Sequence, residues 1–81
     1  MNDNVKPDYF TQEAADLCAK LSPRELQTLI LKGKGYSYKE VGKYMGISMT
    51  TVTDYLKHIY KKLGVHTSEE AVVIGTKAGH L

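Results

Sequence analysis

The residues of this chain best suited to chemistry form a row of polar side chains between positions 50 and 61. At 100° per residue these side chains project from one side of a helix. They offer hydrogen-bond donors, acceptors and mobile positive charge, which is the chemistry that recognises the base edges and phosphates of DNA. The row consists of Thr50, Thr53, Asp54, Lys57 and Lys61.

Catalysis and metal binding have little support in the sequence. It contains no glycine-rich phosphate loop and no arrangement of serine, histidine and aspartate that suggests a nucleophile. The three histidines, His58, His66 and His80, lack the close helical spacing of a metal site, and Cys18 is the only cysteine. We therefore expect a protein that is not an enzyme, with no catalytic residues, no metal and no cofactor.

A helix over 49–63 is expected to position the polar row. Ser48 is a favourable N-cap, and Gly64 supplies a stop. The apolar residues of the segment form a stripe that must face a core, so the polar row must face outward. The stripe is spaced by 4, 3 and 4 positions and consists of Val52, Leu56, Ile59 and Leu63.

A short helix over 38–45 is expected to precede it, with the link 46–48 between the two. The link holds a glycine that ends the first helix, an apolar residue that packs inward and a serine that caps the second. This is the pattern of a helix-turn-helix, here within 37–63, in which a short turn holds two helices at a steep angle. A second helix held in this way fits the major groove of B-DNA, which is about 12 Å wide.

Capping signals predict three more helices, at 12–20, 23–32 and 68–78. A serine or threonine followed three residues later by glutamate marks the starts at 22, 37 and 67, and Thr11 caps the leading helix. Residues 1–10 are expected to form a flexible lead. Because β-branched alternation is absent, the sequence predicts an all-α fold. Besides the stripe, its predicted core consists of Leu26, Leu29, Ile30, Val41, Met45 and Ile47.

Length and composition indicate one small domain. The chain has 81 residues and no apolar run of the roughly 18 residues that span a membrane. Its single cysteine excludes an internal disulfide and favours a reducing, cytoplasmic setting. Residues 1–16 carry one lysine against four acidic residues, whereas 17–81 carry ten basic against five acidic residues. The basic part favours a polyanion partner, although charge alone is better explained by a solvated lysine-rich surface.

Five short motifs, in order along the chain, carry a resemblance to a known family. They are Leu-Ser-Pro-Arg-Glu at 21–25, Gly-Tyr-Ser-Tyr-Lys-Glu-Val at 35–41, Gly-Ile-Ser-Met-Thr-Thr-Val at 46–52, Lys-Leu-Gly-Val at 62–65 and Glu-Ala-Val at 70–72. Together they resemble the LuxR-type (GerE-like) helix-turn-helix domain of bacterial transcription regulators over 21–81. The domain of sigma factors that binds the −35 element shares part of the pattern, but the motif at 62–65 before a capped helix favours the LuxR type.

The resemblance implies a four-helix DNA-binding domain, to which the leading helix is an N-terminal addition. Such a domain usually lies at the C-terminus of a regulator, behind a receiver or ligand-binding domain. The positions that match the family's base-facing residues are Thr53, Asp54 and Lys57. The family often has lysine at position 53 and histidine at 55, so this chain carries less positive charge there.

The resemblance also implies a dimer contact on the last helix, for which Val72 and Val73 are the candidates. Phosphate contacts are expected at the N-termini of both helices of the helix-turn-helix and at the lysines that follow. Each of these residues has a structural alternative as a helix cap or a solvated side chain, and Asp54 as a carboxylate that favours the helix dipole. The predicted phosphate contacts are Ser37, Tyr38, Lys39, Thr50, Thr51 and Lys61, with Lys43 and Lys62 as further lysines that are phosphate contacts or solvated.

We therefore predict a DNA-binding transcription regulator, or its C-terminal effector domain, that binds double-stranded DNA as a homodimer on an inverted repeat. RNA polymerase is a candidate further partner, and neither a membrane nor a small-molecule ligand is expected for this segment. The alternative is an interaction module that keeps the fold but pairs with a related regulator and blocks it. Binding to DNA that weakens steeply with salt would separate the two.

Overall fold

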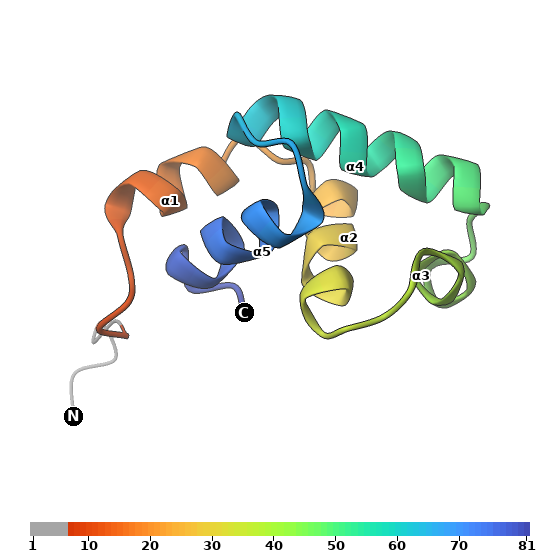
Figure 1. Cartoon of the computed structure of the whole chain (residues 1–81), viewed down its shortest axis with the longest axis horizontal. Coiled ribbons are helices and arrows are strands. Elements are labelled where there is room, and N and C mark those ends of the chain that lie inside the picture. The colour runs from red at the N-terminus through yellow and green to blue at the C-terminus, as the bar shows by residue number, and fades with distance from the viewer. Residues whose placement is uncertain (1–6) are drawn as a thin grey trace.

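The part of the chain that the computed structural model describes, residues 7–81, folds into helices with no strand among them. α4 runs along one edge, α2 and α5 pack beneath it, α3 lies at one end and α1 at the other (Figure 1). The predicted all-α fold is confirmed. The elements are α1 (Gln12–Cys18), α2 (Pro23–Gly33), α3 (Tyr38–Met45), α4 (Met49–Leu63) and α5 (Ser68–Lys77).

Every helix begins where a hydroxyl side chain caps it. The oxygens of these N-cap residues accept a hydrogen bond from the backbone amide three residues later, so one amide of each first turn is satisfied. Helices α3 and α4 have the predicted bounds, and the ends of the others differ by one or two residues because helix termini fray into turns. The N-caps are Thr11, Ser22, Ser37, Ser48 and Thr67.

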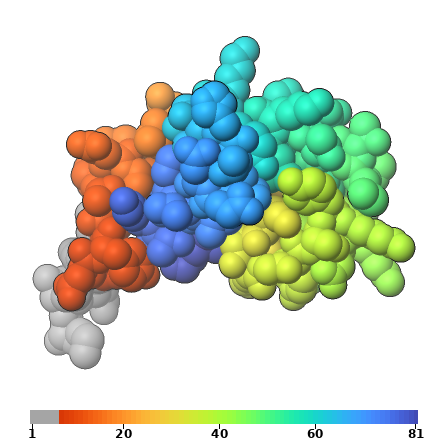
Figure 2. Space-filling model, in the orientation of Figure 1, coloured from red at the N-terminus to blue at the C-terminus, as the bar shows by residue number. Residues whose placement is uncertain are grey.

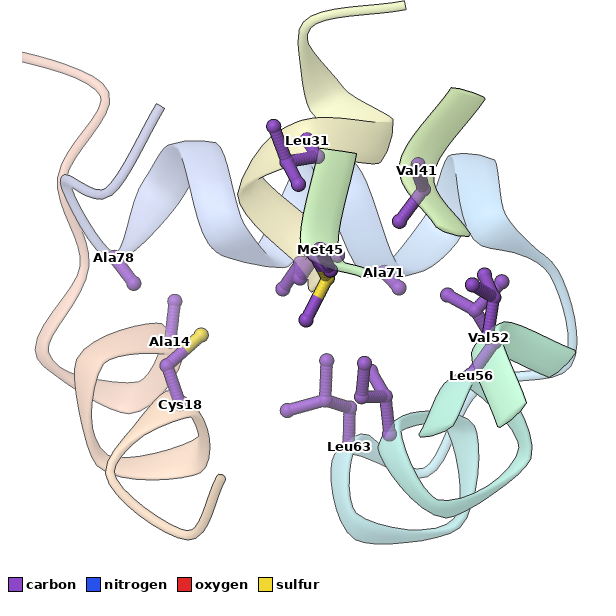
Figure 3. Packing of buried hydrophobic residues seen from close by; sticks show 12 residues of the cluster. Ala14, Cys18, Leu31, Val41, Met45, Val52, Leu56, Leu63, Ala71 and Ala78 are labelled. Carbon is purple, nitrogen blue, oxygen red and sulfur yellow. The ribbon is translucent and has the colours of Figure 1, made fainter. Parts of the chain in front are cut away.

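The apolar stripe of α4 lies at the centre of the core. Its four members are between 0 and 4% exposed, which confirms the predicted inward face. Figure 3 shows Val52, Leu56 and Leu63 on one side of the cluster, facing Met45 of α3 and Ala71 of α5. Because the stripe is buried along its whole length, the opposite side of α4 must face solvent.

Helix α2 is rotated relative to the prediction. Leu26 and Ile30 were expected in the core, and that expectation is wrong: both are half-buried and line a shallow surface groove with Tyr44. Glu25 and Thr28 are buried in their place. The rotation is tolerated because these two side chains are satisfied inside, Thr28 by donating to the Arg24 carbonyl at 2.9 Å and Glu25 by the contacts described below.

Helix α1 packs on α5 (Figures 1 and 2). Ala14 and Cys18 point toward Ala78 (Figure 3). The amide of Thr11 donates to the Lys77 carbonyl at 2.9 Å, and the Tyr9 hydroxyl donates to the Leu81 carbonyl at 3.5 Å. Residues 1–6 of the expected flexible lead lie outside the described residues.

Candidate nucleic-acid interface

The polar row of α4 lies on the surface, where it was predicted. Asp54, Lys57, Lys61 and Thr50 are exposed and Thr53 is half-buried, while the stripe on the other side of the same helix is buried. In the space-filling view the atoms of α4, coloured green to cyan, form one edge of the molecule (Figure 2). The five side chains therefore share one surface that a large partner can approach.

The turn between α3 and α4 is fixed by two glycines. Gly46 ends α3 in the left-handed conformation, with φ 71° and ψ 34°, which costs a glycine little. Gly42 is buried, and a Cβ at this position would lie 2.8 Å from the Ile47 carbonyl oxygen. The Ile47 amide also donates to the Gly42 carbonyl at 2.9 Å. This close approach of backbone to backbone sets how α4 leaves α3.

Hydroxyl groups at the start of α4 are engaged with the helix itself. The Ser48 Oγ accepts from the Thr51 amide at 3.1 Å and lies 2.9 Å from the Thr51 Oγ1. The Thr53 Oγ1 donates to the Met49 carbonyl at 3.0 Å. Of the predicted contacts here, Thr50 is exposed, whereas Thr51 is half-buried and partnered by Ser48.

At the start of α3, Ser37 is occupied as a helix cap. Its Oγ accepts from the Glu40 amide at 3.1 Å and its own amide donates to the Glu40 carboxylate at 2.8 Å. The hydrogen bond from the Ser37 amide, followed by that from its side chain, holds the pKa of Glu40 below its usual value. Lys39, next along the helix, is exposed.

Tyr38 is 39% exposed and contacts side chains of other helices. The Lys32 Nζ lies 4.6 Å from the centre of its ring, a cation–π contact. Its phenol adjoins that of Tyr60 of α4, which also adjoins Ser68 of α5. Burial and the neighbouring phenol of Tyr38 raise the pKa of Tyr60 to about 12. At these phenols the start of α3 meets α4 and α5.

A buried carboxylate beneath α4 was missed by sequence reasoning. Glu25 is 5% exposed, its Oε1 lies 2.7 Å from the Lys62 Nζ, and its Oε2 lies 3.8 Å from the His58 Nδ1. Burial alone would raise the pKa of Glu25, but hydrogen bonds from Lys62 and Ser22 hold it below its usual value. His58 and Lys62 are four residues apart, hence on one side of α4, and this spacing was the available signal. Lys62 is therefore engaged with Glu25 rather than simply solvated.

The surface of the helix-turn-helix is basic but not strongly so. Lys39 and Lys43 on α3 and Lys57 and Lys61 on α4 are exposed, and Asp54 places one negative charge among them. Within residues 7–81 no group of three or more histidine, cysteine or acidic side chains could hold a metal ion. Nor is any helix in this part of the chain long and apolar enough to cross a membrane.

The chain is similar to known regulatory proteins of bacteria. Residues 19–74 match the family model described as bacterial regulatory proteins, luxR family. The HTH-type transcriptional activator RamA of Corynebacterium glutamicum is 42% identical over 62 residues, covering 76% of this chain and 22% of that protein. The transcriptional activator protein CarR of Pectobacterium carotovorum is 43% identical over 72 residues, 89% of this chain and 28% of that protein.

A third relative is the oxygen regulatory protein NreC of Staphylococcus aureus, which is 37% identical over 67 residues, 83% of this chain and 31% of that protein. The chain thus spans between about a fifth and a third of the length of these relatives. No solved structure matches the chain significantly.

Proposed function

Since the chain belongs to the luxR family of bacterial regulatory proteins, we propose that it recognises a specific DNA sequence with the outer face of α4 in the major groove. The family makes it a helix-turn-helix domain of DNA-binding transcription regulators. The proposal concerns which residues contact DNA and in what assembly.

The observation that carries the proposal is the two-sided character of α4. One side is buried in the core to within a few per cent, so the helix is held rigidly, and the other presents short polar and basic side chains to solvent. In our proposal Thr53, Asp54 and Lys57 contact base edges, because they lie at the centre of that face and match in type the groups that base edges bind.

Phosphate contacts would flank this face. Lys61 on α4 and Lys39 on α3 are exposed cations on either side of the turn, and Thr50 adds an exposed hydroxyl. Ser37, Tyr38 and Thr51 are engaged within the protein, so their contribution would be through backbone amides of the helix N-termini or through lone pairs.

A dimer on an inverted repeat is the assembly we propose. One helix reaches only a few base edges, and about 1–3 kcal/mol of discrimination per good contact does not select one site in a genome. Helix α5 is the candidate dimer contact. Val73 is 51% exposed, and the half-buried Val72 lines a shallow groove on the surface of the helix. Because two relatives, RamA and CarR, are named transcriptional activators, RNA polymerase is a candidate partner of the DNA-bound dimer.

Selection of bound duplexes from a random library, followed by anisotropy titration at about 50 and 200 mM salt, tests the proposal. We expect an enriched inverted repeat, and a log–log salt slope of about −0.9 for each phosphate neutralised. Enrichment of no sequence, with weak binding indifferent to salt, would contradict it.

The second candidate function is the interaction module that pairs with a related regulator. What favours it is the modest charge of the outer face of α4, where Asp54 is exposed and Lys62 is engaged by Glu25. In the same titration this function predicts no selected sequence. It predicts instead that adding the chain releases a related regulator from its own operator.

A further inference from the structure

One apolar side chain stands out at the start of α4. Met49 is the first residue of that helix and is 51% exposed, although it lies beside the polar row. It caps nothing, because Ser48 performs that role. A large exposed apolar side chain at the end of a helix expected to enter DNA is therefore unexplained by the fold.

Thr53 extends this apolar surface by one helical turn. Because a carbonyl oxygen can only accept, the hydroxyl hydrogen of Thr53 is directed at the Met49 carbonyl, 3.0 Å away. What Thr53 then offers to a partner is its γ-methyl group and an acceptor lone pair. Residues four apart lie on the same side of a helix, so Thr53 and Met49 share one side of α4.

The first turn of α4, where Met49 lies, is uncharged. The charged residues of the helix follow it: Asp54 comes directly after Thr53, Lys57 lies one turn further on, and Lys61 and Lys62 are in the last turn. The hydroxyls of Ser48 and Thr51 lie 2.9 Å apart and partner each other. The N-terminal end of the outer face is thus neutral and partly apolar, whereas the charged groups begin at Asp54.

We propose that Met49 and the methyl group of Thr53 read thymine by its C5-methyl group. This methyl is the apolar group that a base pair presents in the major groove, and the N-terminal residues of a recognition helix are those that reach base edges. The flexible thioether side chain of methionine fits such a contact. The inference rests on the proposed function and names the chemistry of one position in its target.

The test uses the duplex selected above and removes one methyl at a time. Each thymidine is replaced singly by deoxyuridine, and Kd is measured for the intact chain and for Met49→Ala, Thr53→Ser and Thr53→Val. We expect one thymine in each half-site whose replacement weakens the intact chain about fourfold, the ratio expected for burying one methyl-sized group. For Met49→Ala and Thr53→Ser, the Kd for the deoxyuridine duplex should be nearly equal to the Kd for the thymidine duplex.

Two variants serve as matched controls. Thr53→Val keeps a methyl and should keep the deoxyuridine penalty, and Lys61→Ala should weaken binding without altering that penalty. A selected sequence without a sensitive thymine would overturn the inference while the proposed function stands. So would a penalty that persists in both Met49→Ala and Thr53→Ser. If no sequence is selected at all, the proposed function itself fails.

Discussion

The Nζ atom of Lys62 lies 2.7 Å from a carboxylate oxygen of Glu25, 37 residues earlier in the chain. The same carboxylate caps the Ser22 amide at 2.9 Å, so it joins the start of α2 to the last turn of α4. A single buried group thereby fixes the helix that carries the polar row against the scaffold beneath it.

Lys62→Met should destabilise the fold by about 1–3 kcal/mol, because it leaves the buried Glu25 carboxylate without its charged donor. The free energy of unfolding in urea measures this loss. Lys61→Met is the matched control, since Lys61 is the exposed neighbour and should change stability by about 0.5 kcal/mol or less. Equal effects of the two substitutions would show that the ion pair contributes nothing.

Acid should weaken the fold through the same carboxylate. The pKa of Glu25 is lowered in the folded state, so its stabilisation is present above the ordinary glutamate pKa of 4.5 and is lost as pH falls through the lower pKa of the folded state. The urea midpoint of the intact chain should therefore fall below pH 4.5, and that of Glu25→Gln should fall less. If the urea midpoints of the intact chain and of Glu25→Gln fall by the same amount as the pH is lowered, Glu25 does not have this role.

Two isoleucines test which faces are buried. Ile59→Ala should cost about 2–5 kcal/mol, as truncation of a fully buried isoleucine does, because Ile59 is 0% exposed. Ile30→Ala, on the half-buried side of α2, should cost less than half as much. Denaturant midpoints compare them directly, and equal losses would mean that α2 packs as the sequence alone predicted.

Val73→Asp should prevent two copies from binding an inverted repeat while leaving the monomer folded, because Val73 is 51% exposed and contributes little to the core. Gel-shift stoichiometry and circular dichroism measure the two properties. Tyr44→Asp is the control, an exposed apolar residue on α3, away from α5. If two copies of Val73→Asp still bind the inverted repeat, α5 does not form the dimer contact.

The helix-turn-helix could be predicted from sequence because its signals are local. Ser48 caps α4 within three residues, Gly46 ends α3, and the spacing of the apolar stripe selects one face of α4. These features depend on neighbours in the chain, so the pattern identifies them without knowledge of the packing. Which of the exposed residues contact bases stays a prediction, since it depends on a partner.

The orientation of α2 could not be predicted in this way. Leu26, Leu29 and Ile30 share one side of the helix, so periodicity assigned Leu26 and Ile30 to the core together with Leu29. What turns Glu25 inward is a lysine on another helix, 37 residues away. A contact of this range depends on how α2 packs against α4, which a short sequence pattern does not specify.

Two lysines on the outer face of α4, Lys57 and Lys61, test whether this face reads bases. The affinities of Lys57→Ala and Lys61→Ala are measured for the selected duplex and for its single-base variants at several salt concentrations. Lys57→Ala should weaken binding and lose about 1–3 kcal/mol of discrimination at one base pair. Lys61→Ala should weaken all sequences alike and reduce the salt slope by about one. If both variants lower affinity uniformly and leave every base preference intact, Lys57 does not contact a base and the outer face of α4 does not read the sequence as proposed.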